Sequence, residues 1–330
     1  MDRILVIKLG ALGDFILSYR AMTAIRAHHA HARITLLTIP SLAALAGAAG
    51  LFDEIWLDDR PRATQPGGWL ALARRLNGGG FARVYDLQTS GRTGYYFALM
   101  GWPFSTRRPE WSGIVRGCTH RHEAADRTAK HSLERQVDQL AIAGIGHDEY
   151  PALDLGWADA DISRHPFIGG EEPYVLLVPG GSAGHPEKRW PAPFYGQLAA
   201  RLAARGVTPV VVGTALEAAA CAETAAGSPR AVNLCDDSPV LDVMALARGA
   251  AAAIGNDTGP MHLVAFMGCP SVSLFSGASA AAMNRPRGPF EGPGAIPPPP
   301  GLGTDTVTVL SRHDLSQLSV GPVLAALRLR

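Results

Sequence analysis

Residues 255–262 read Gly-Asn-Asp-Thr-Gly-Pro-Met-His, and this stretch decides the architecture that we expect. The apolar run at 250–254 precedes it and is typical of a buried parallel strand. The apolar residues at 263–267 predict a short helix, which Asp257 or Thr258 can cap. The order strand, tight turn, helix leaves the first N–H groups of the helix free to bind a phosphate. An ordinary capped turn is the alternative interpretation.

Composition and length limit the classes of protein that fit. A chain of 330 residues suits two domains, and its formal net charge of +1 argues against a general nucleic-acid binder. The four cysteines are scattered without zinc spacing, which favours reduced thiols in a cytoplasmic protein. The apolar stretch at 4–9 is too short for a signal peptide, and it predicts a first strand instead. We find no run as long as a membrane span.

Outward from residues 255–262, the chain alternates short apolar strands with helices, which predicts parallel sheets covered on both faces. The expected strands lie at 4–9, 33–38, 54–57, 84–87, 174–178, 207–212, 231–234, 250–254, 271–275 and 306–310. Residues 102–130 are expected to be irregular. We expect an N-terminal domain at 1–155, a linker at 156–172, a C-terminal domain at 173–312 and a closing helix within 313–330.

The turn after the first strand holds a candidate catalytic carboxylate. The sequence at 10–13 has two glycines but does not match the dinucleotide fingerprint GxGxxG. Asp14 stands at the start of the following helix. It is either an N-cap or a carboxylate that takes a proton from a substrate hydroxyl.

The loop at 179–191 opens the second half in the same way. Ser182 offers a hydroxyl and Lys188 a cation that can meet a diphosphate, although the P-loop pattern is absent. A solvated surface pair with Arg189 is the alternative for Lys188. Glu217 begins a helix, where it binds a ribose hydroxyl or compensates the helix dipole. The paired acids of the chain do not demand a metal.

The segment at 105–131 is basic and lies in the irregular part of the first half. It carries six Lys or Arg residues against three acids. Such a segment can hold an acidic acceptor, and a mobile solvated loop is the alternative.

Taken together, these motifs resemble those of the bacterial heptosyltransferases, GT-B glycosyltransferases that add heptose to the inner core of lipopolysaccharide. The resemblance covers nearly the whole chain, apart from the proline-rich insert at 292–303. Its most specific stretches are 254–263 and 270–277, followed by 4–14, 179–191, 83–88 and 131–136.

The resemblance implies a GT-B α/β fold, in which two Rossmann-like parallel-sheet domains face a central crevice and the closing helix packs back on the N-terminal domain. It implies that the N-terminal half binds the acceptor and that the C-terminal half binds a nucleotide sugar, typically ADP-heptose. It also implies an inverting enzyme that needs no metal or other cofactor. The acceptor is then a lipopolysaccharide core or another glycan, with peripheral contact at the cytoplasmic face of the inner membrane.

The resemblance also assigns roles residue by residue. Asp14 matches the catalytic base, and Lys188 with Ser182 matches the diphosphate contacts. The donor motif matches at Asp257, Thr258, Gly259 and His262, and the ribose contact at Glu217. The acceptor-side candidates are Gly13, Gln88 and Arg92. Two alternatives stay open: a GT-B transferase of another sugar onto a surface polysaccharide or glycoprotein, and a non-catalytic nucleotide-sugar binding module.

Overall fold

The computed structural model describes residues 1–101, 105, 107–181 and 184–330, and it divides into two compact units. The first unit is Met1–Ala152 and the second is Leu153–Arg330. The segment expected as a linker belongs to the second unit, where Arg248 Nη2 donates hydrogen bonds to the carbonyls of Leu155 and Ala158.

The first unit is built on one six-stranded sheet in the order β3-β2-β1-β4-β5-β6, among the described residues, and every pair of neighbours is parallel. The strands are β1 (Arg3–Ile7), β2 (Arg33–Thr38), β3 (Glu54–Leu57), β4 (Arg83–Asp86), β5 (Glu110–Gly113) and β6 (His120–Arg121). Residues 4–7 of the central strand β1 are completely buried, because helices cover both faces of the sheet.

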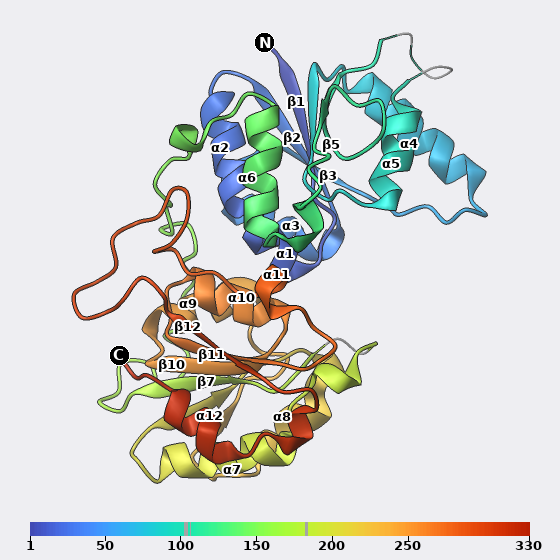
Figure 1. The fold of residues 1–330 in the computed structure, drawn as a ribbon. Helices are drawn as coiled ribbons and strands as arrows, with labels where there is room; N and C mark the ends of the chain where they lie inside the picture. Colours follow the sequence, from blue (N-terminus) through green and yellow to red (C-terminus); the bar gives the residue numbers. More distant parts are fainter. Residues whose placement is uncertain (102–104, 106, 182–183) are drawn as a thin grey trace. The chain divides into compact units, whose positions relative to one another are not determined.

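Helices α2 and α6 cover one face of this sheet, and α4 and α5 cover the other (Figure 1). The helices of this unit are α1 (Leu12–Leu17), α2 (Tyr19–His28), α3 (Ala43–Ala48), α4 (Pro66–Gly78), α5 (Gly91–Leu99) and α6 (Ser132–Ile142). The single helix expected after the first turn is two helices in the structure. The helix is interrupted at Ser18, whose hydroxyl donates to the carbonyl of Asp14 at 2.7 Å. Such local side-chain bonds compete with the helical ladder.

Strands β5 and β6 correct the expectation that residues 102–130 are irregular. Trp111 in β5 is fully buried, and its ring meets that of Phe97 edge-on at 5.2 Å between centroids. The two strands have four and two residues, with polar residues among them. They are too short to show the alternation by which a strand is recognised in a sequence.

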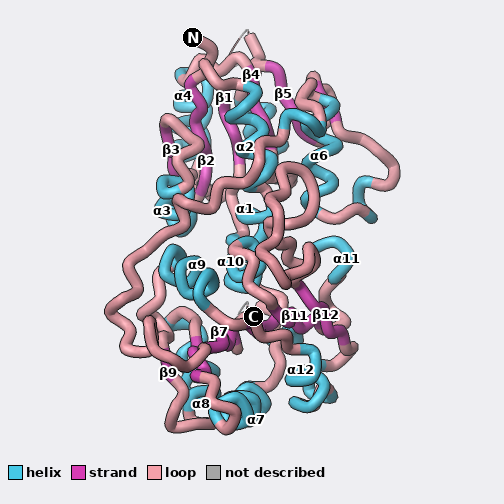
Figure 2. Tube along the Cα trace, turned by 90° about the vertical axis from the view of Figure 1, so that its left-hand side faces the viewer, coloured by secondary structure: helices cyan, strands magenta, loops and turns pink. Residues whose placement is uncertain are grey.

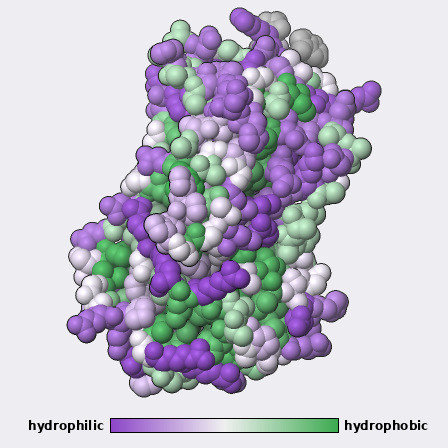
Figure 3. All heavy atoms as spheres, turned by 60° about the vertical axis from the view of Figure 1, so that its left-hand side comes forward, coloured by the Kyte–Doolittle hydropathy of each residue, from purple (hydrophilic) through white to green (hydrophobic). Residues whose placement is uncertain are grey.

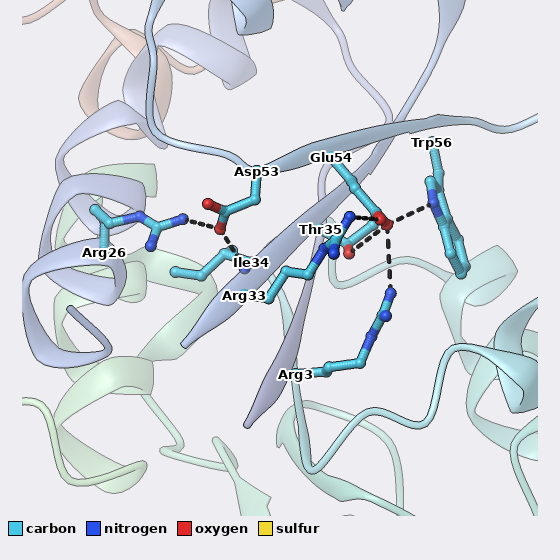
Figure 4. Close-up of polar contacts among 8 residues, drawn as sticks. All are labelled: Arg3, Arg26, Arg33, Ile34, Thr35, Asp53, Glu54 and Trp56. Atoms are coloured by element: carbon cyan, nitrogen blue, oxygen red, sulfur yellow. Dashed lines mark hydrogen bonds and ion pairs between the residues drawn. The ribbon is translucent and has the colours of Figure 1, made fainter. Parts of the chain in front are cut away.

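Polar contacts fix the edge strand β3 to its neighbours (Figure 4). The Glu54 carboxylate accepts hydrogen bonds from side chains on three strands, namely Arg3, Arg33, Thr35 and Trp56. Beside it, the Asp53 carboxylate accepts from Arg26 at 2.6 Å and from the backbone N–H of Ile34 at 2.7 Å. The backbone bond is the main cause that lowers the pKa of Asp53.

The second unit repeats the same strand order in its own six-stranded parallel sheet, β12-β11-β10-β7-β8-β9, again among the described residues. Its strands are β7 (Tyr174–Val178), β8 (Thr208–Val211), β9 (Val232–Asn233), β10 (Ala252–Asn256), β11 (Ser271–Phe275) and β12 (Val307–Ser311). Helices α9 and α10 cover one face, and α7, α8 and α12 cover the other (Figures 1 and 2). The helices are α7 (Ala192–Ala203), α8 (Ala218–Ala225), α9 (Val240–Gly249), α10 (Gly259–Phe266), α11 (Ala281–Asn284) and α12 (Val320–Ala326).

The C-terminal segment is tied into the core of the second unit. Val320 and Val323 of α12 are buried in the same cluster as Leu318 and the residues of α7. Trp190 Nε1 donates to the carbonyl of Leu318 at 2.7 Å. The expected closing helix covers only Val320–Ala326, and its buried residues pack against its own unit.

The surface of the molecule is mixed in character. On the face drawn in Figure 3, hydrophilic side chains cover much of the area and hydrophobic residues gather in separate patches. Of the helices in the described ranges, none has the length and apolar character that a membrane crossing requires.

Candidate functional site

The two sheets place their candidate residues at equivalent points. In each, the first strand pairs with the strand that begins the other half of the sheet, β1 with β4 and β7 with β10. Ligands of such sheets bind outside the carboxyl ends of the strands where the order reverses. Asp14 and Gln88 follow β1 and β4, whereas the glycines at 180–181 and Asp257 follow β7 and β10.

In the second unit, Lys188 and Asp257 form an ion pair. Lys188 Nζ lies 3.2 Å from Asp257 Oδ2, and the two side chains are 24% and 12% exposed. The hydroxyl of Ser279 donates to the same oxygen at 2.6 Å. An ammonium group is thus held at the end of β10, still open to solvent, beside the turn that leads into α10.

Helix α10 presents the rest of the predicted donor motif. Thr258 is its N-cap residue without a side-chain capping bond, and Gly259 is its first residue. The first N–H groups therefore retain the partial positive charge of a helix start. His262, one turn on, is only 6% exposed. Gly255 lets the turn pack closely, since a Cβ there would lie 2.5 Å from Met261 Sδ.

Asn256 is a residue of this site that sequence reasoning missed. It is fully buried, and its Oδ1 accepts from the backbone N–H of Trp190 at 2.9 Å and from the Tyr195 hydroxyl at 3.1 Å. Its Nδ2 donates to the carbonyls of Pro179 and Gly180, both at 2.9 Å. Asn256 thus fixes the loop after β7 to the end of β10. A polar residue at the end of an apolar strand was the signal that could have revealed it.

Glu217 lies against the same loop. Its carboxylate accepts from the N–H of Thr214 at 2.8 Å and from the Thr214 hydroxyl at 2.5 Å. A Cβ on Gly180 would lie only 2.6 Å from Glu217 Cγ, so the two segments touch. The structure brings Glu217 and the glycine loop together, whereas Ser182 lies outside the described residues.

In the first unit, Asp14 lines a polar cavity of about 210 Å³. Its Oδ2 accepts from the backbone N–H of Ala11 at 3.2 Å, so the carboxylate also caps its own helix. The N-cap residue of α1 is Ala11, so the expectation that Asp14 is the N-cap was wrong, and its role as a base stays a prediction. The cavity is lined by Lys8, Asp14, Leu87, Gln88, Thr89, Arg127, Ser132, Arg135, Gln136 and Gln139.

Positive charge surrounds this cavity. Lys8 is 4% exposed and donates to the carbonyl of Leu87 at 3.2 Å. Burial lowers the pKa of Lys8, although the nearby carboxylates of Asp14 and Asp86 act to raise it. Burial, and then Arg135, also lowers the pKa of Arg127. Such crowded cations are stabilised by an anion.

Asp86 ends β4 beneath the same cavity. It is fully buried, and its Oδ1 accepts from the backbone N–H groups of Gln88 at 3.1 Å and Thr89 at 2.9 Å. Burial raises the pKa of Asp86 to about 6, although these bonds and Lys8 oppose the shift. Sequence reasoning missed Lys8, Asp86 and Arg135 as site residues because they lie on separate elements.

The three acceptor-side candidates do not all lie together in the structure. Gln88 lines the cavity, and its Oε1 accepts from the Leu9 N–H at 2.9 Å. Gly13 is buried within α1. Arg92 instead donates to the Tyr96 hydroxyl at 3.3 Å and lies 5.6 Å from the centre of the Trp69 ring. The structure does not bring Arg92 into the cavity that holds Asp14.

Within the described ranges, we find no group of three or more His, Cys, Asp or Glu side chains that could hold a metal ion.

Comparison with known proteins identifies relatives of both units. Residues 69–288 match the family model described as glycosyltransferase family 9 (heptosyltransferase). Lipooligosaccharide heptosyltransferase 2 of Haemophilus influenzae is 30% identical over 115 residues, which is 33% of each chain. Lipopolysaccharide heptosyltransferase 2 of Escherichia coli is 28% identical over 136 residues, 39% of each chain. These matches thus span little more than a third of the curated relatives.

Solved structures resemble the whole fold. The E. coli ADP-heptose lipopolysaccharide heptosyltransferase II superposes with a TM-score of 0.73 at 21% identity, covering 99% of this chain and 97% of that one. The E. coli heptosyltransferase WaaC with ADP gives a TM-score of 0.73 at 16% identity, covering 98% of both chains. This likeness confirms the expected two-domain α/β fold of the GT-B type.

Proposed function

The chain belongs to glycosyltransferase family 9, the heptosyltransferase family, and on that premise we propose that it transfers heptose from ADP-heptose to a lipopolysaccharide core. The observation that carries this proposal is the Lys188–Asp257 pair at the end of β10, next to the start of α10. A nucleoside diphosphate carries more negative charge than the single Asp257 carboxylate, and the start of α10 adds partial positive charge to attract it.

The second unit binds the nucleotide sugar in this proposal. Lys188 exchanges its contact with Asp257 for the diphosphate, and the N–H groups at the start of α10 meet the second phosphate. Thr258, Gly259 and His262 form the wall of that site, and Glu217 binds the ribose. As the bond to the sugar breaks, the leaving ADP gains negative charge, which Lys188 and the helix stabilise where it develops.

The first unit binds the acceptor. Asp14 accepts the proton from the acceptor hydroxyl as its oxygen attacks the anomeric carbon. The buried Lys8, with Arg127 and Arg135, supports an acceptor that carries an acidic group next to the attacking hydroxyl. Gln88 is the acceptor-side residue that lines the same cavity.

A single displacement of this kind inverts the anomeric centre. It requires one base and an electrostatic partner for the leaving group, and we assign these two roles to Asp14 and Lys188. The proposal therefore includes a metal-independent reaction. Because the acceptor is a lipid-linked glycan, it also includes peripheral contact with the cytoplasmic face of the inner membrane.

Product formation tests this proposal directly. The purified chain is incubated with ADP-heptose and a deacylated inner-core oligosaccharide, and mass spectrometry follows the acceptor. We expect the acceptor to gain one heptose. Parallel reactions with UDP- and GDP-linked sugars test the alternative of another donor, while nucleotide binding without any product would indicate a non-catalytic binding module.

Calorimetry with ADP, UDP and GDP provides an independent measurement. We expect ADP to bind most tightly, in keeping with the family. Tighter binding of UDP or GDP would leave the fold unchanged but contradict the proposed donor.

A further inference from the structure

Helices α4 and α5 of the first unit present apolar and aromatic side chains to solvent. Leu70 on α4 is 41% exposed, and Tyr95 on α5 is 64% exposed. The partly exposed ring of Trp69 connects the two helices, because its centroid lies 5.8 Å from that of Tyr95. The helices lie side by side on one face of the sheet (Figure 1), so these three side chains belong to one patch.

The charges around this patch are almost all of one sign. Residues 60–78 and 91–99 contain no Asp, Glu or Lys, and Asp59 directly precedes them. Trp69 Nε1 donates to the carbonyl of Arg62 at 3.0 Å, and the Arg92 guanidinium lies 5.6 Å from the centre of the Trp69 ring. Trp69, Leu70 and Tyr95 form the α4–α5 surface together with five arginines, namely Arg60, Arg62, Arg74, Arg75 and Arg92.

The outward leucine departs from what an amphipathic helix needs for folding. Helix α4 already buries Leu72, Ala73 and Leu76 against its own unit. Its opposite face would ordinarily carry polar residues. Leu70 instead points an apolar side chain to solvent, and the exposed Arg74 follows one turn later. Such a combination gains free energy only from a partner that is both apolar and negatively charged.

The headgroup region of an anionic bilayer has these two properties. Trp and Tyr rings are stable at the level of the headgroups, and apolar side chains enter the boundary with the acyl chains. Arginines at the same depth meet the lipid phosphates and the negative surface potential. A polyanion in solution would use the arginines but would gain little from an exposed leucine.

We propose that the α4–α5 surface docks the protein on a membrane that contains anionic phospholipids. Trp69, Leu70 and Tyr95 enter the headgroup region, and the arginines bind the phosphates around them. Contact of this kind lies in the plane of the interface and requires no helix to cross the bilayer. It is reversible, because few apolar side chains are inserted.

The α4–α5 surface extends to the edge of the sheet that carries Asp14. Arg60 Nη2 donates to the carbonyl of Leu9, which follows β1, at 2.6 Å. Arg92 Nη2 donates to the carbonyl of Pro61 at 3.4 Å and thereby joins α5 to this segment. Docking therefore holds the cavity near the headgroups, where a lipid-linked acceptor carries its glycan. This consequence rests on the proposed function, whereas docking itself does not.

Co-sedimentation of the full chain with vesicles tests the docking. We expect binding to vesicles of phosphatidylcholine with phosphatidylglycerol, weak binding to phosphatidylcholine alone, and loss of binding at high salt. Arg74→Ala should lower the partition coefficient by about fivefold. The double variant Leu70→Ser/Tyr95→Ser should lower it by about three- to tenfold.

Matched controls come from surfaces outside the patch. Ile142→Ser removes a side chain that is 45% exposed on α6, which covers the opposite face of the same sheet. Arg201→Ala removes an exposed charge from the second unit. Both should bind vesicles like the wild type, and circular dichroism checks that every variant is folded.

Three results would overturn the docking proposal. They are no binding of the wild type to anionic vesicles, equal losses in the control variants, and binding that depends on Arg74 but not on Leu70 and Tyr95. The last result would indicate a polyanion in solution instead of a bilayer.

Heptose transfer tests the consequence separately. Leu70→Ser/Tyr95→Ser is expected to slow transfer to an acceptor embedded in anionic vesicles and to leave transfer to a deacylated acceptor unchanged. Equal rates with both acceptors would contradict the link between docking and catalysis. If the wild type transfers no heptose to either acceptor, the proposed function fails while the vesicle measurement still decides the docking.

Discussion

Lys188 Nζ lies 3.2 Å from Asp257 Oδ2, although 69 residues separate the two in the chain. The pair connects the loop after β7 to the turn after β10, the two neighbouring strands at the point where the order reverses. Asp257 holds the ammonium group in this place, where we propose that a diphosphate with more negative charge replaces the carboxylate.

Replacing Lys188 with alanine is therefore expected to weaken ADP binding. A charge-assisted hydrogen bond of this kind contributes about 1.5–3 kcal/mol, so Lys188→Ala should lose roughly ten- to a hundredfold in affinity by calorimetry. Arg201→Ala, on the exposed side of α7, is the matched control that also removes one positive charge. Equal affinities in the two variants would remove Lys188 from the site.

Asp14→Asn is expected to separate catalysis from donor binding. Loss of a general base typically lowers turnover by about two to four orders of magnitude. ADP affinity should stay unchanged, because Asp14 lies in the unit that binds the acceptor. Asp148→Asn, an exposed substitution in the same unit, controls for the loss of a negative charge. Near-normal turnover of Asp14→Asn would rule out its role as the base.

Asn256→Ala should affect both stability and donor binding. The variant leaves the Trp190 N–H, the Tyr195 hydroxyl and two loop carbonyls without their buried partner. We expect the free energy of unfolding to fall by about 2–4 kcal/mol, measured by urea denaturation. ADP affinity should fall as well, because the glycine loop loses its anchor. Gln197→Ala, exposed on α7, should change neither quantity.

Chelation should leave the reaction intact. Because Lys188 and the start of α10 stabilise the leaving group in the proposed mechanism, we expect full turnover in excess EDTA. The measurement is the rate of heptose transfer before and after chelation. A loss that Mg²⁺ or Mn²⁺ alone restores would demonstrate a metal site.

Asp86→Asn should change how stability depends on pH. Burial raises the pKa of Asp86 to about 6, so the folded state binds more protons than the unfolded state between about pH 4 and pH 6. Ionising this group therefore lowers the stability of the wild type as pH rises through that window. His29, whose pKa burial lowers to about 4, acts in the opposite direction. The difference between variant and wild type isolates Asp86.

We expect that difference to favour Asp86→Asn by about 1–3 kcal/mol more at pH 7 than at pH 4. Denaturant unfolding at a series of pH values measures it. A difference that is constant with pH would show that Asp86 ionises normally in the folded chain.

The local elements were predictable because a short apolar strand or a glycine turn can be recognised from a few consecutive residues. Residues 255–262 predicted the turn between β10 and α10, whereas Asp14, predicted on the turn after β1, lies within α1. The family resemblance supplied the pairing of two similar sheets. Local patterns carry this information because the spacing of apolar residues and the position of a glycine turn are properties of a short stretch of sequence.

What the sequence could not predict depends on distant residues. The cationic cavity combines Lys8, Arg127 and Arg135 from three separate segments, and no spacing rule connects them. Arg92 was an acceptor-side candidate because of its position in the sequence, but in the structure its guanidinium contacts Tyr96 and Trp69.

The repeated strand order has a consequence for how such a chain can evolve. Each unit has a complete sheet and its own buried core, and each presents its ligands at the reversal of its own strand order. Substitutions that reshape the cavity around Lys8 leave the sheet that carries Lys188 and Asp257 untouched. On the proposed division of roles, acceptor preference can therefore diversify by drift or recombination within residues 1–152, while the donor site is inherited unchanged.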